Sequence, residues 1–288
     1  MGSNVVRTDN EATSLNSISV GEVELDLLLE GIYRLYGYDF RQYARSTVRR
    51  RLAEIIGREA LDNLSMLQGK ILRTPELLDK VVSSLSIQVS SLFRDPRFYH
   101  AFRHRAVPLL RTYPSIRIWL AGCSTGEEVY SMAILLTEED LLNKCRIYGT
   151  DLNSDALATA SRGTYSAPHI AKSERDYKEA GGARSLSDYF QISGKEAQIL
   201  PSLQRRATFF QHNLVTDASF NDFHVIFSRN VLIYFIKPLQ DRVHELLYQS
   251  LVRFGILGLG ANETLHLTPK EKHYRPLDET ARLYRRTD

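Results

Sequence analysis

The spacing of apolar residues changes along the chain and divides it into segments of different structure. Residues 1–20 are rich in Ser, Asn and Thr and show no apolar periodicity, which predicts a disordered tail. Over residues 21–87 apolar residues recur every three or four positions, as they do on one face of a helix. The sequence therefore predicts a small all-α domain at 21–87. Its four helical stripes begin at Leu25, Val48, Leu61 and Leu77.

Beyond residue 115, short apolar runs alternate with amphipathic stretches. This alternation is typical of a mostly parallel sheet covered by helices on both faces. We therefore expect a Rossmann-like α/β domain over 116–288, joined to the helical domain by a linker and helix over 88–115. The expected strands are 116–121, 146–150, 208–212, 225–228, 257–260 and 281–286. The expected helices are 130–142, 154–161 and 239–254.

The stretch 165–206 interrupts the alternation and is too long for a plain crossover loop. Residues 189–192 and 198–203 have the pattern of short antiparallel strands. We expect a helical piece followed by a small antiparallel β insert at about 187–206.

Composition excludes several classes of protein. A chain of 288 residues with 43% hydrophobic and 25% charged residues is an ordinary globular protein, long enough for one large domain and a small one. A net charge of +3 is too small to indicate nucleic acid binding by itself. The chain contains neither an apolar run of membrane-helix length nor a signal-peptide pattern, so we expect a cytoplasmic protein.

Cysteine and histidine usage gives no indication of a metal site. The two cysteines, Cys123 and Cys145, lack a spaced Cys/His set around them, which indicates a reduced compartment and no structural zinc. His100 and His104 have the spacing of metal ligands, but the glutamate of the zinc-protease motif is missing between them. We expect no bound metal.

The most informative segment is the turn that follows the first expected strand. It contains Gly122 and Gly126, which allow the backbone to turn sharply and to approach a ligand closely. The helix after this turn opens with Glu127 and Glu128, which would repel a diphosphate. Two carboxylates suit a cofactor that carries positive charge, such as S-adenosylmethionine (SAM) with its ammonium and sulfonium groups. A SAM-dependent methyltransferase is therefore favoured over a dehydrogenase.

Polar residues at the ends of the next two strands point to the same crevice. Asp151 ends the second strand, where a carboxylate can accept hydrogen bonds from both hydroxyls of a ribose. Alternatively, Asp151 caps the helix that follows. Asn213 and Leu214 come after the third strand, where a contact to adenine and an ordinary turn are equally good interpretations.

Arg229, Asn230 and Tyr234 follow the fourth strand and are expected at the crevice where the strand order reverses. Arg94, in the linker, could bind a cofactor carboxylate through its guanidinium, or could simply pair with Asp95. No Ser-His-Asp or Cys-His arrangement is visible. A glutamate acceptor fits this absence, because its pKa of about 4.3 leaves it ionised at neutral pH without a general base.

Arginines recur at i, i+4 and i+8 in Arg41, Arg45 and Arg49, which predicts one stripe along the second helix with Arg50 beside it. A charged stripe is usually a solvated helix face. The alternative is a docking surface for an acidic partner. Aromatic residues do not interleave the arginines, so single-stranded nucleic acid is not favoured as the partner.

Taken together, these segments resemble the chemotaxis receptor methyltransferases, the CheR family. The resemblance implies SAM-dependent methyl esterification of glutamates on the cytoplasmic signalling helices of chemoreceptors, the methyl-accepting chemotaxis proteins, with S-adenosylhomocysteine as the product. It rests on ordered motifs: Tyr38-Asp39-Phe40, Arg49-Arg50-Arg51-Leu52, Leu92-Phe93-Arg94-Asp95, Ala121-Gly122-Cys123-Ser124-Thr125-Gly126-Glu127-Glu128, Arg229-Asn230-Val231-Leu232-Ile233-Tyr234-Phe235 and Tyr274-Arg275-Pro276-Leu277-Asp278-Glu279.

The resemblance also implies roles for individual residues. Arg94 would hold the methionyl carboxylate, Glu127 the methionyl amine and Asp151 the ribose. Tyr234 would lie near the transferring methyl group, with Arg229 as a second catalytic candidate. The residues around the adenosyl part would be Asn213, Leu214, Arg229 and Asn230. The docking residues on the acidic receptor bundle would be Arg41, Arg45, Arg49 and Arg50.

The chain departs from the family pattern at several positions. Gln88 and Ser90 stand where the family usually has Asn and Thr, and both can still hydrogen-bond to the cofactor. Val129, Ile236 and Ala261 replace the usual Pro, Asp and His. The β insert lacks the glycine-rich loop expected of members that grip a receptor tail, so tethering to a tail peptide is not expected.

The departures leave two alternatives open. One is a SAM-binding scaffold or sensor with little turnover. The other is a diverged methyltransferase with another acceptor. Under each of the three functional hypotheses we expect a monomer.

Overall fold

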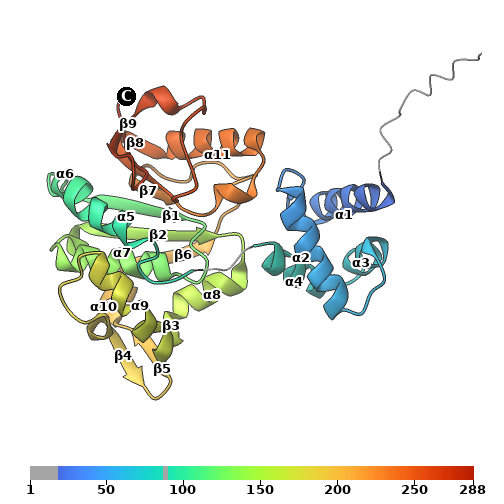
Figure 1. The fold of residues 1–288 in the computed structure, drawn as a ribbon, viewed down its shortest axis with the longest axis horizontal. Coiled ribbons are helices and arrows are strands. Elements are labelled where there is room, and N and C mark those ends of the chain that lie inside the picture. The colour runs from blue at the N-terminus through green and yellow to red at the C-terminus, as the bar shows by residue number, and fades with distance from the viewer. Residues whose placement is uncertain (1–18, 87–89) are drawn as a thin grey trace, which may run out of the picture.

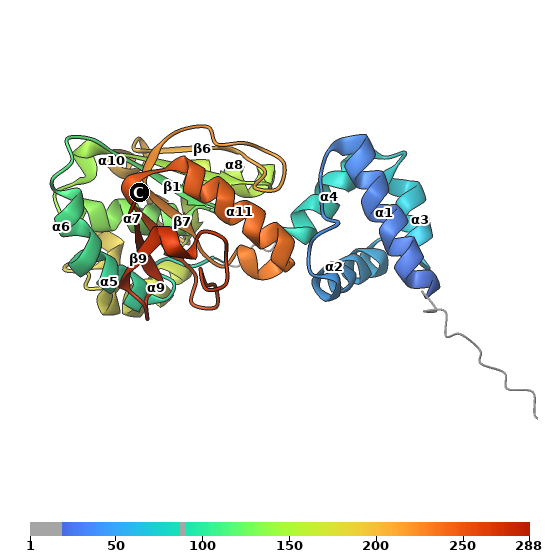
Figure 2. The same cartoon turned by 90° about the horizontal axis from the view of Figure 1, so that it is seen from above.

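The computed structural model describes residues 19–86 and 90–288, which form a small helical domain beside a larger α/β domain (Figure 1). The predicted tail lies outside the described residues except for Ser19 and Val20. Seen from above, the two domains stand side by side, with α2 and α4 toward the larger one (Figure 2).

All four predicted helices of the small domain are present. Apolar residues from each of them form one core, in which Leu25, Val48, Leu67 and Val81 are fully buried. The helices are α1 (Val20–Tyr36), α2 (Arg45–Arg58), α3 (Leu64–Ile71) and α4 (Pro75–Leu85). Because α2 begins only at Arg45, the prediction that Arg41 belongs to the second helix was wrong. Residues 40–43 instead form a turn closed by a hydrogen bond from Tyr43 N to Phe40 O (3.1 Å).

The α/β domain has a seven-stranded sheet in the order β6-β2-β1-β7-β8-β10-β9. Strands β6, β2, β1, β7 and β8 are parallel, whereas β10 runs antiparallel to both of its neighbours. This mixed sheet confirms the predicted Rossmann-like class. The strands are β1 (Ile116–Ala121), β2 (Cys145–Asp151), β6 (Ala207–Gln211), β7 (Phe223–Ser228), β8 (Leu251–Leu259), β9 (Tyr274–Asp278) and β10 (Leu283–Arg286).

Side chains of β1 alternate between two cores, one on each face of the sheet. Ile118 and Leu120 belong to the core that also contains α5 and α7, whereas Trp119 and Ala121 belong to the core under α11. The main helices are α5 (Pro96–Ala101), α6 (Val107–Leu110), α7 (Glu127–Glu138), α8 (Ser154–Arg162) and α11 (Lys237–Ser250). Short helical turns are η1 (Phe102–Ala106), η2 (Leu142–Lys144), η4 (Leu232–Tyr234) and η5 (Glu271–His273).

The predicted insert is a separate three-stranded antiparallel sheet in the order β3-β5-β4. The predicted strand over 198–203 was wrong beyond Ile199, because Pro201 starts a helical turn there. The insert comprises β3 (Thr164–Ser166), α9 (Ala167–Glu179), η3 (Leu186–Tyr189), β4 (Phe190–Ser193), β5 (Glu196–Ile199) and α10 (Pro201–Gln204).

Two other details differ from the sequence prediction. The end of the predicted helix 239–254 is the beginning of β8, and β9 was not predicted at all. Only Gln249 and Ser250 separate the apolar residues of α11 from those of the strand, so periodicity alone does not place the boundary.

The segment before α2 attaches the helical domain to the sheet. Tyr43 forms an isolated antiparallel bridge with Phe235, and their rings lie 4.8 Å apart. Ala44 N donates to Tyr234 O (2.8 Å), and Ile236 N donates to Gln42 O (3.0 Å). The helical domain therefore contacts the polypeptide that leaves the carboxyl end of β7.

Candidate cofactor site

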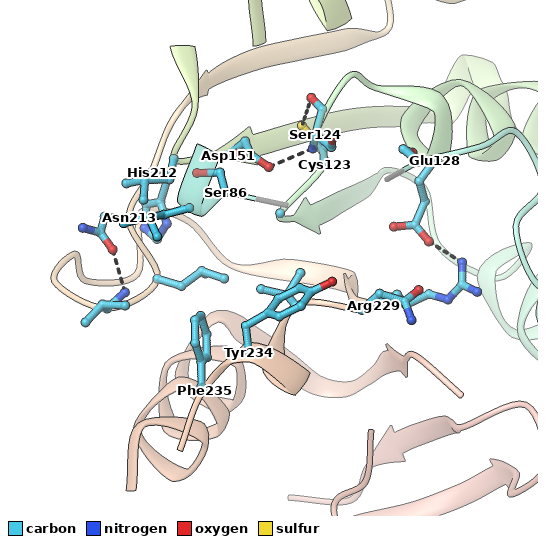
Figure 3. A pocket seen from close by; sticks show the side chains of 18 of the residues that line it. Ser86, Cys123, Ser124, Glu128, Asp151, His212, Asn213, Arg229, Tyr234 and Phe235 are labelled. Atoms are coloured by element: carbon cyan, nitrogen blue, oxygen red, sulfur yellow. Dashed lines mark hydrogen bonds and ion pairs between the residues drawn. The ribbon is translucent and has the colours of Figure 1, made fainter. Parts of the chain in front are cut away.

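A cavity lies at the carboxyl ends of β1, β2, β6 and β7, the edge at which open α/β sheets bind ligands. The helical domain contributes Tyr43, Leu85 and Ser86 to its wall. Ser86 is labelled in Figure 3. The cavity is therefore built by both domains, and the sheet supplies most of its polar groups.

The structure brings together most of the residues predicted to bind the cofactor or to act in catalysis. Gln88 lies outside the described residues. Glu127 does not line the cavity, whereas its neighbour Glu128 does. The predicted residues that line the cavity are Ser90, Arg94, Gly122, Asp151, Asn213, Leu214, Arg229, Asn230 and Tyr234.

The turn after β1 requires glycine at both predicted positions. Gly122 has φ +77°, and a Cβ there would lie 2.5 Å from Val231 Cγ2. Gly126 has φ +90°, and its Cβ would lie 2.8 Å from Cβ of Ala160. Any side chain at either position would both strain the backbone and collide with a neighbour. Gly122 thus lies at the cavity wall, and Gly126 shapes the turn behind it.

Asp151 at the end of β2 is held by backbone donors and not by a cation. Its Oδ2 accepts from Ser124 N (2.8 Å) and its Oδ1 from Asn153 N (3.0 Å). Each carboxylate oxygen keeps a second lone pair for a ligand hydroxyl. Burial raises the pKa of Asp151 above its usual value, against the opposing effect of these hydrogen bonds. Asn153, rather than Asp151, caps α8 through its side chain.

The two glutamates that open α7 have different surroundings. The Glu127 carboxylate is buried, accepts from Thr125 Oγ1 (2.7 Å) and lies 3.8 Å from His169 Nε2 of the insert. Glu128 faces the cavity and pairs with Arg229. Because consecutive helical residues point about 100° apart, the two carboxylates face different directions, and Glu128 is the one that lines the cavity. The geometry therefore favours Glu128 over the predicted Glu127 as the group that meets a ligand amine.

Arg229 is a buried cation between two carboxylates. Its guanidinium pairs with Glu128 and with Asp95 Oδ2 (2.9 Å), and it also donates to Arg94 O (3.0 Å). The group lies 4.2 Å from the centre of the Phe98 ring, and the side chain is only 2% exposed. These contacts indicate that Arg229 fixes the wall of the cavity. A guanidinium held in this way does not act as an acid or base.

Four non-glycine residues with left-handed backbone lie in or beside the cavity: Phe93 (φ +55°), Asp95 (+58°), Ser124 (+50°) and Asn230 (+61°). Conformations of this kind cost free energy and persist where the surrounding structure holds them.

Asn230 shows what holds one of these conformations. Glu263 is almost fully buried, and its carboxylate accepts from the backbone N–H groups of Asn230 (3.0 Å), Val231 (2.8 Å), Leu232 (2.7 Å) and Gly260 (2.6 Å). Burial nevertheless raises the pKa of Glu263. Sequence reasoning did not assign Glu263 a role.

Aromatic residues that sequence reasoning missed close one side of the cavity. Tyr43 reaches in from the helical domain and packs edge-on against Phe235. Burial raises the pKa of Tyr43, so its phenol stays protonated.

The predicted Tyr234 projects into the space between the Asp151–Ser124 pair and the Glu128–Arg229 pair (Figure 3).

Two further lining residues had no assigned cofactor role. His212 directly follows β6, and its Nε2 lies 3.1 Å from Ala218 O. Burial raises the pKa of the Cys123 thiol well above its usual value, which disfavours the thiolate that a nucleophile needs.

Three departures from the family pattern lie away from the cavity. Ile236 occupies the N-cap position of α11 and is 42% exposed, so its substitution removes a helix cap and leaves the cavity wall unchanged. Val129 is buried within α7, and Ala261 is exposed. None of the three lines the cavity. Ser90, by contrast, does.

The predicted arginine stripe is paired with acidic residues of α1. Arg49 pairs with Glu22, and Arg45 pairs with Asp26. Arg41 pairs with Glu30 of the same helix and with Asp39. Arg50 is exposed.

The charges of the cavity fit a cofactor that carries an amine, a sulfonium, a carboxylate and a ribose. Glu128 and Asp151 bring two carboxylates to the cavity wall, and Arg94 brings a guanidinium. In the part of the chain that the structure describes, no cluster of three or more His, Cys, Asp or Glu side chains could hold a metal ion. No helix in that part is long and apolar enough to cross a membrane.

Comparison with known families matches both domains. Residues 23–86 match the all-alpha domain of CheR methyltransferases, and residues 88–281 match the SAM-binding domain of CheR methyltransferases.

The chain belongs to the CheR methyltransferase family. The predicted resemblance, the fold class and the cofactor SAM are thereby confirmed. The SAM-binding domain of this CheR chain contains every predicted cofactor residue.

Three relatives show how far the similarity extends. A protein of Pseudomonas putida, provisionally named methyltransferase Cher3, is 41% identical over 92% of this chain and 97% of its own length. The chemotaxis protein methyltransferase of Listeria monocytogenes is 29% identical over 81% of this chain and 87% of its own. The chemotaxis protein methyltransferase Cher2 of P. putida is 26% identical over 90% and 95%.

Proposed function

We propose that this CheR methyltransferase transfers the methyl group of SAM to glutamate side chains on the signalling helices of chemoreceptors and forms glutamate methyl esters. The names of the relatives from Listeria and Pseudomonas, chemotaxis protein methyltransferases, support this substrate class. The observation that carries the proposal is the position of α2, which starts at the cavity. Ala44, one residue before the helix, is hydrogen-bonded to Tyr234 O. An acidic helix docked along α2 would therefore present its carboxylates to the cavity.

Each polar group of the cavity has a proposed role in holding the cofactor. Glu128 binds the methionyl amine, in place of the predicted Glu127, and Arg94 binds the methionyl carboxylate. Asp151 accepts from the ribose hydroxyls through the lone pairs that Ser124 and Asn153 leave open. Asn213 and Leu214 lie where the adenine would be, and Ser90 supplies a further hydroxyl.

The acceptor carboxylate needs no base, because it is ionised at neutral pH. Bound SAM supplies an electrophilic methyl group on its sulfonium. The protein has to exclude water and to align the acceptor with that methyl group. Tyr43 and Phe235 pack together at the mouth and can shield it from solvent. Tyr234, whose side chain projects into the cavity, is placed to orient the acceptor carboxylate.

Methyl-labelled SAM and membranes that carry receptors test this function. We expect label on the receptor bands that is released as methanol in mild alkali, the behaviour of a carboxyl methyl ester. The variant Asp151→Asn serves as the control for weakened cofactor binding and should give much less label. Alkali-stable label would contradict ester formation. Absence of receptor label from a protein that binds SAM would contradict the receptor substrate.

A further inference from the structure

The acidic residues of α1 are spaced like the arginines they meet. Glu22, Asp26 and Glu30 stand at i, i+4 and i+8 of α1 and pair, in reverse order, with Arg49, Arg45 and Arg41. We call these three pairs the charge ladder. A regular series of this kind places the carboxylates of α1 where the acids of an external helix would otherwise bind.

One pair of the charge ladder is anchored. Arg41 donates through Nε to Asp39 Oδ1 (2.9 Å) and through Nη2 to Asp39 Oδ2 (2.8 Å), in addition to its contact with Glu30 (2.9 Å). Its guanidinium lies 3.7 Å from the centre of the Tyr33 ring. The Arg41 guanidinium holds the pKa of Asp39 below its usual value. Bidentate pairing and ring stacking make Arg41 part of the domain structure.

The other two pairs are open to solvent. Arg45 and Asp26 are 42% and 58% exposed, and Arg49 and Glu22 are 37% and 41% exposed. Each of these arginines has one carboxylate partner among the described residues. Exposed single pairs contribute little to stability, so another carboxylate can replace the one on α1 at small cost.

Arg45, one of the two exchangeable arginines, lies beside the segment that contacts the cavity wall. Arg45 directly follows Ala44, whose N–H donates to Tyr234 O (2.8 Å). Arg49 lies one helical turn further along α2. A partner helix that places one glutamate near Tyr234 would reach these two arginines with acids one turn apart.

We propose that Glu22 and Asp26 act as an internal competitor for the receptor. They occupy Arg49 and Arg45 in the free enzyme, and carboxylates of the receptor helix displace them on docking. The preferred partner is then a helix with acids at i and i+4, the spacing of Glu22 and Asp26. This inference rests on the proposed function.

The test is the double variant Glu22→Gln and Asp26→Asn in the full chain. Removal of the competing charges should lower the KM for receptor about threefold to tenfold at low salt, because each exposed pair is worth up to about 1 kcal/mol. The difference should shrink as salt screens the charges. The matched control is Asp62→Asn with Glu76→Gln, two exposed acids of the same domain for which no ion pair is found in the described structure. It should leave KM unchanged.

Further measurements separate the possible failures. In a background of Arg45→Gln and Arg49→Gln, removal of Glu22 and Asp26 charges should no longer lower KM, and thermal unfolding should show that every variant is folded. Equal KM values for the double variant and its control would overturn the internal competitor while leaving the function intact. A wild-type protein that binds SAM but methylates no receptor would overturn the proposed function and this inference with it.

Discussion

The molecule contains two sets of arginine–carboxylate pairs that differ in burial. Arg229 is 2% exposed and is held by Glu128 and Asp95 in the cavity wall. The exchangeable pairs of the charge ladder, Arg45 with Asp26 and Arg49 with Glu22, are all at least 37% exposed. In the first set, water cannot replace a partner that the Arg229 guanidinium loses, because that side chain is buried. In the second, water or another carboxylate can.

The comparison shows that an arginine–carboxylate pair can either fix a cavity wall or form a contact that is easily exchanged. The buried set gives the cavity one fixed shape, at the cost of desolvating the charges of Arg229 and Glu128, whereas Asp95 remains 43% exposed. The exposed set leaves the pairing reversible, as a docking surface requires. Burial, rather than the residue types, distinguishes the two.

Loss of Arg229 should have the largest effect. Arg229→Gln leaves Glu128 and Asp95 without their shared cation, and removal of one partner of a buried pair costs about 3–5 kcal/mol. We expect a fall of that size in the free energy of unfolding, measured by urea denaturation, together with loss of SAM binding. Arg45→Gln, its exposed counterpart, should change the unfolding free energy by about 1 kcal/mol or less. Equal effects would break the distinction between the two sets.

The second-largest effect is expected on SAM affinity, from substitution of the two glutamates at the start of α7. Glu128→Gln should weaken SAM binding at least about tenfold, the loss of one charge-assisted contact, because Glu128 faces the cavity. Glu127→Gln should weaken it less, since that side chain faces Thr125 and His169. Calorimetric titration with SAM measures both. A larger loss in Glu127→Gln would restore the original prediction.

Acidification should weaken SAM binding through Asp151. Its pKa is raised by burial, so as the pH falls this carboxyl takes up a proton at a higher pH than an ordinary aspartate. Protonation replaces an acceptor by a donor and removes a partner of the ribose hydroxyls. The SAM affinity should therefore decrease as the pH falls through that raised pKa. In Asp151→Asn this pH dependence should disappear, and its persistence would assign the effect to another group.

The smallest effect concerns the stability of the helical domain. Glu22→Gln with Asp26→Asn removes two exposed pairs and should lower the free energy of unfolding by about 1 kcal/mol or less in total. Urea denaturation of the full chain measures this change. A loss of several kcal/mol would show that the exposed pairs are structural, like Arg229, and would contradict their exchange on docking.

The sequence predicted the sheet and the turn beside the cavity because residues close together in the chain determine them. Gly122, Gly126 and Asp151 follow strands whose apolar runs are unambiguous, and parallel strands bring their carboxyl ends together. The sequence alone could not show whether Glu127 or Glu128 lines the cavity. The answer depends on the angle at which α7 leaves the turn, and a shift of one residue rotates the side chain by about 100°.

The contributions of tertiary packing could not be predicted either. Tyr43 enters the cavity only because the segment before α2 pairs with the chain after β7. The same pairing makes a turn of residues 40–43 and removes Arg41 from the helix, although the i, i+4, i+8 spacing suggested a single stripe. Local sequence carries no signal for a contact between segments so distant in the chain.

The most direct test of the account is the dependence of receptor methylation on Arg45 and Arg49. Initial rates would be measured over a range of receptor concentrations for the wild type and for Arg45→Glu with Arg49→Glu, and the SAM affinity of both would be determined separately. The account predicts that kcat/KM for receptor falls at least about tenfold in the variant, as two attractive contacts become repulsive, while SAM affinity is unchanged. Methylation at the wild-type rate would show that the arginines are solvated surface and that the acceptor reaches the cavity by another route.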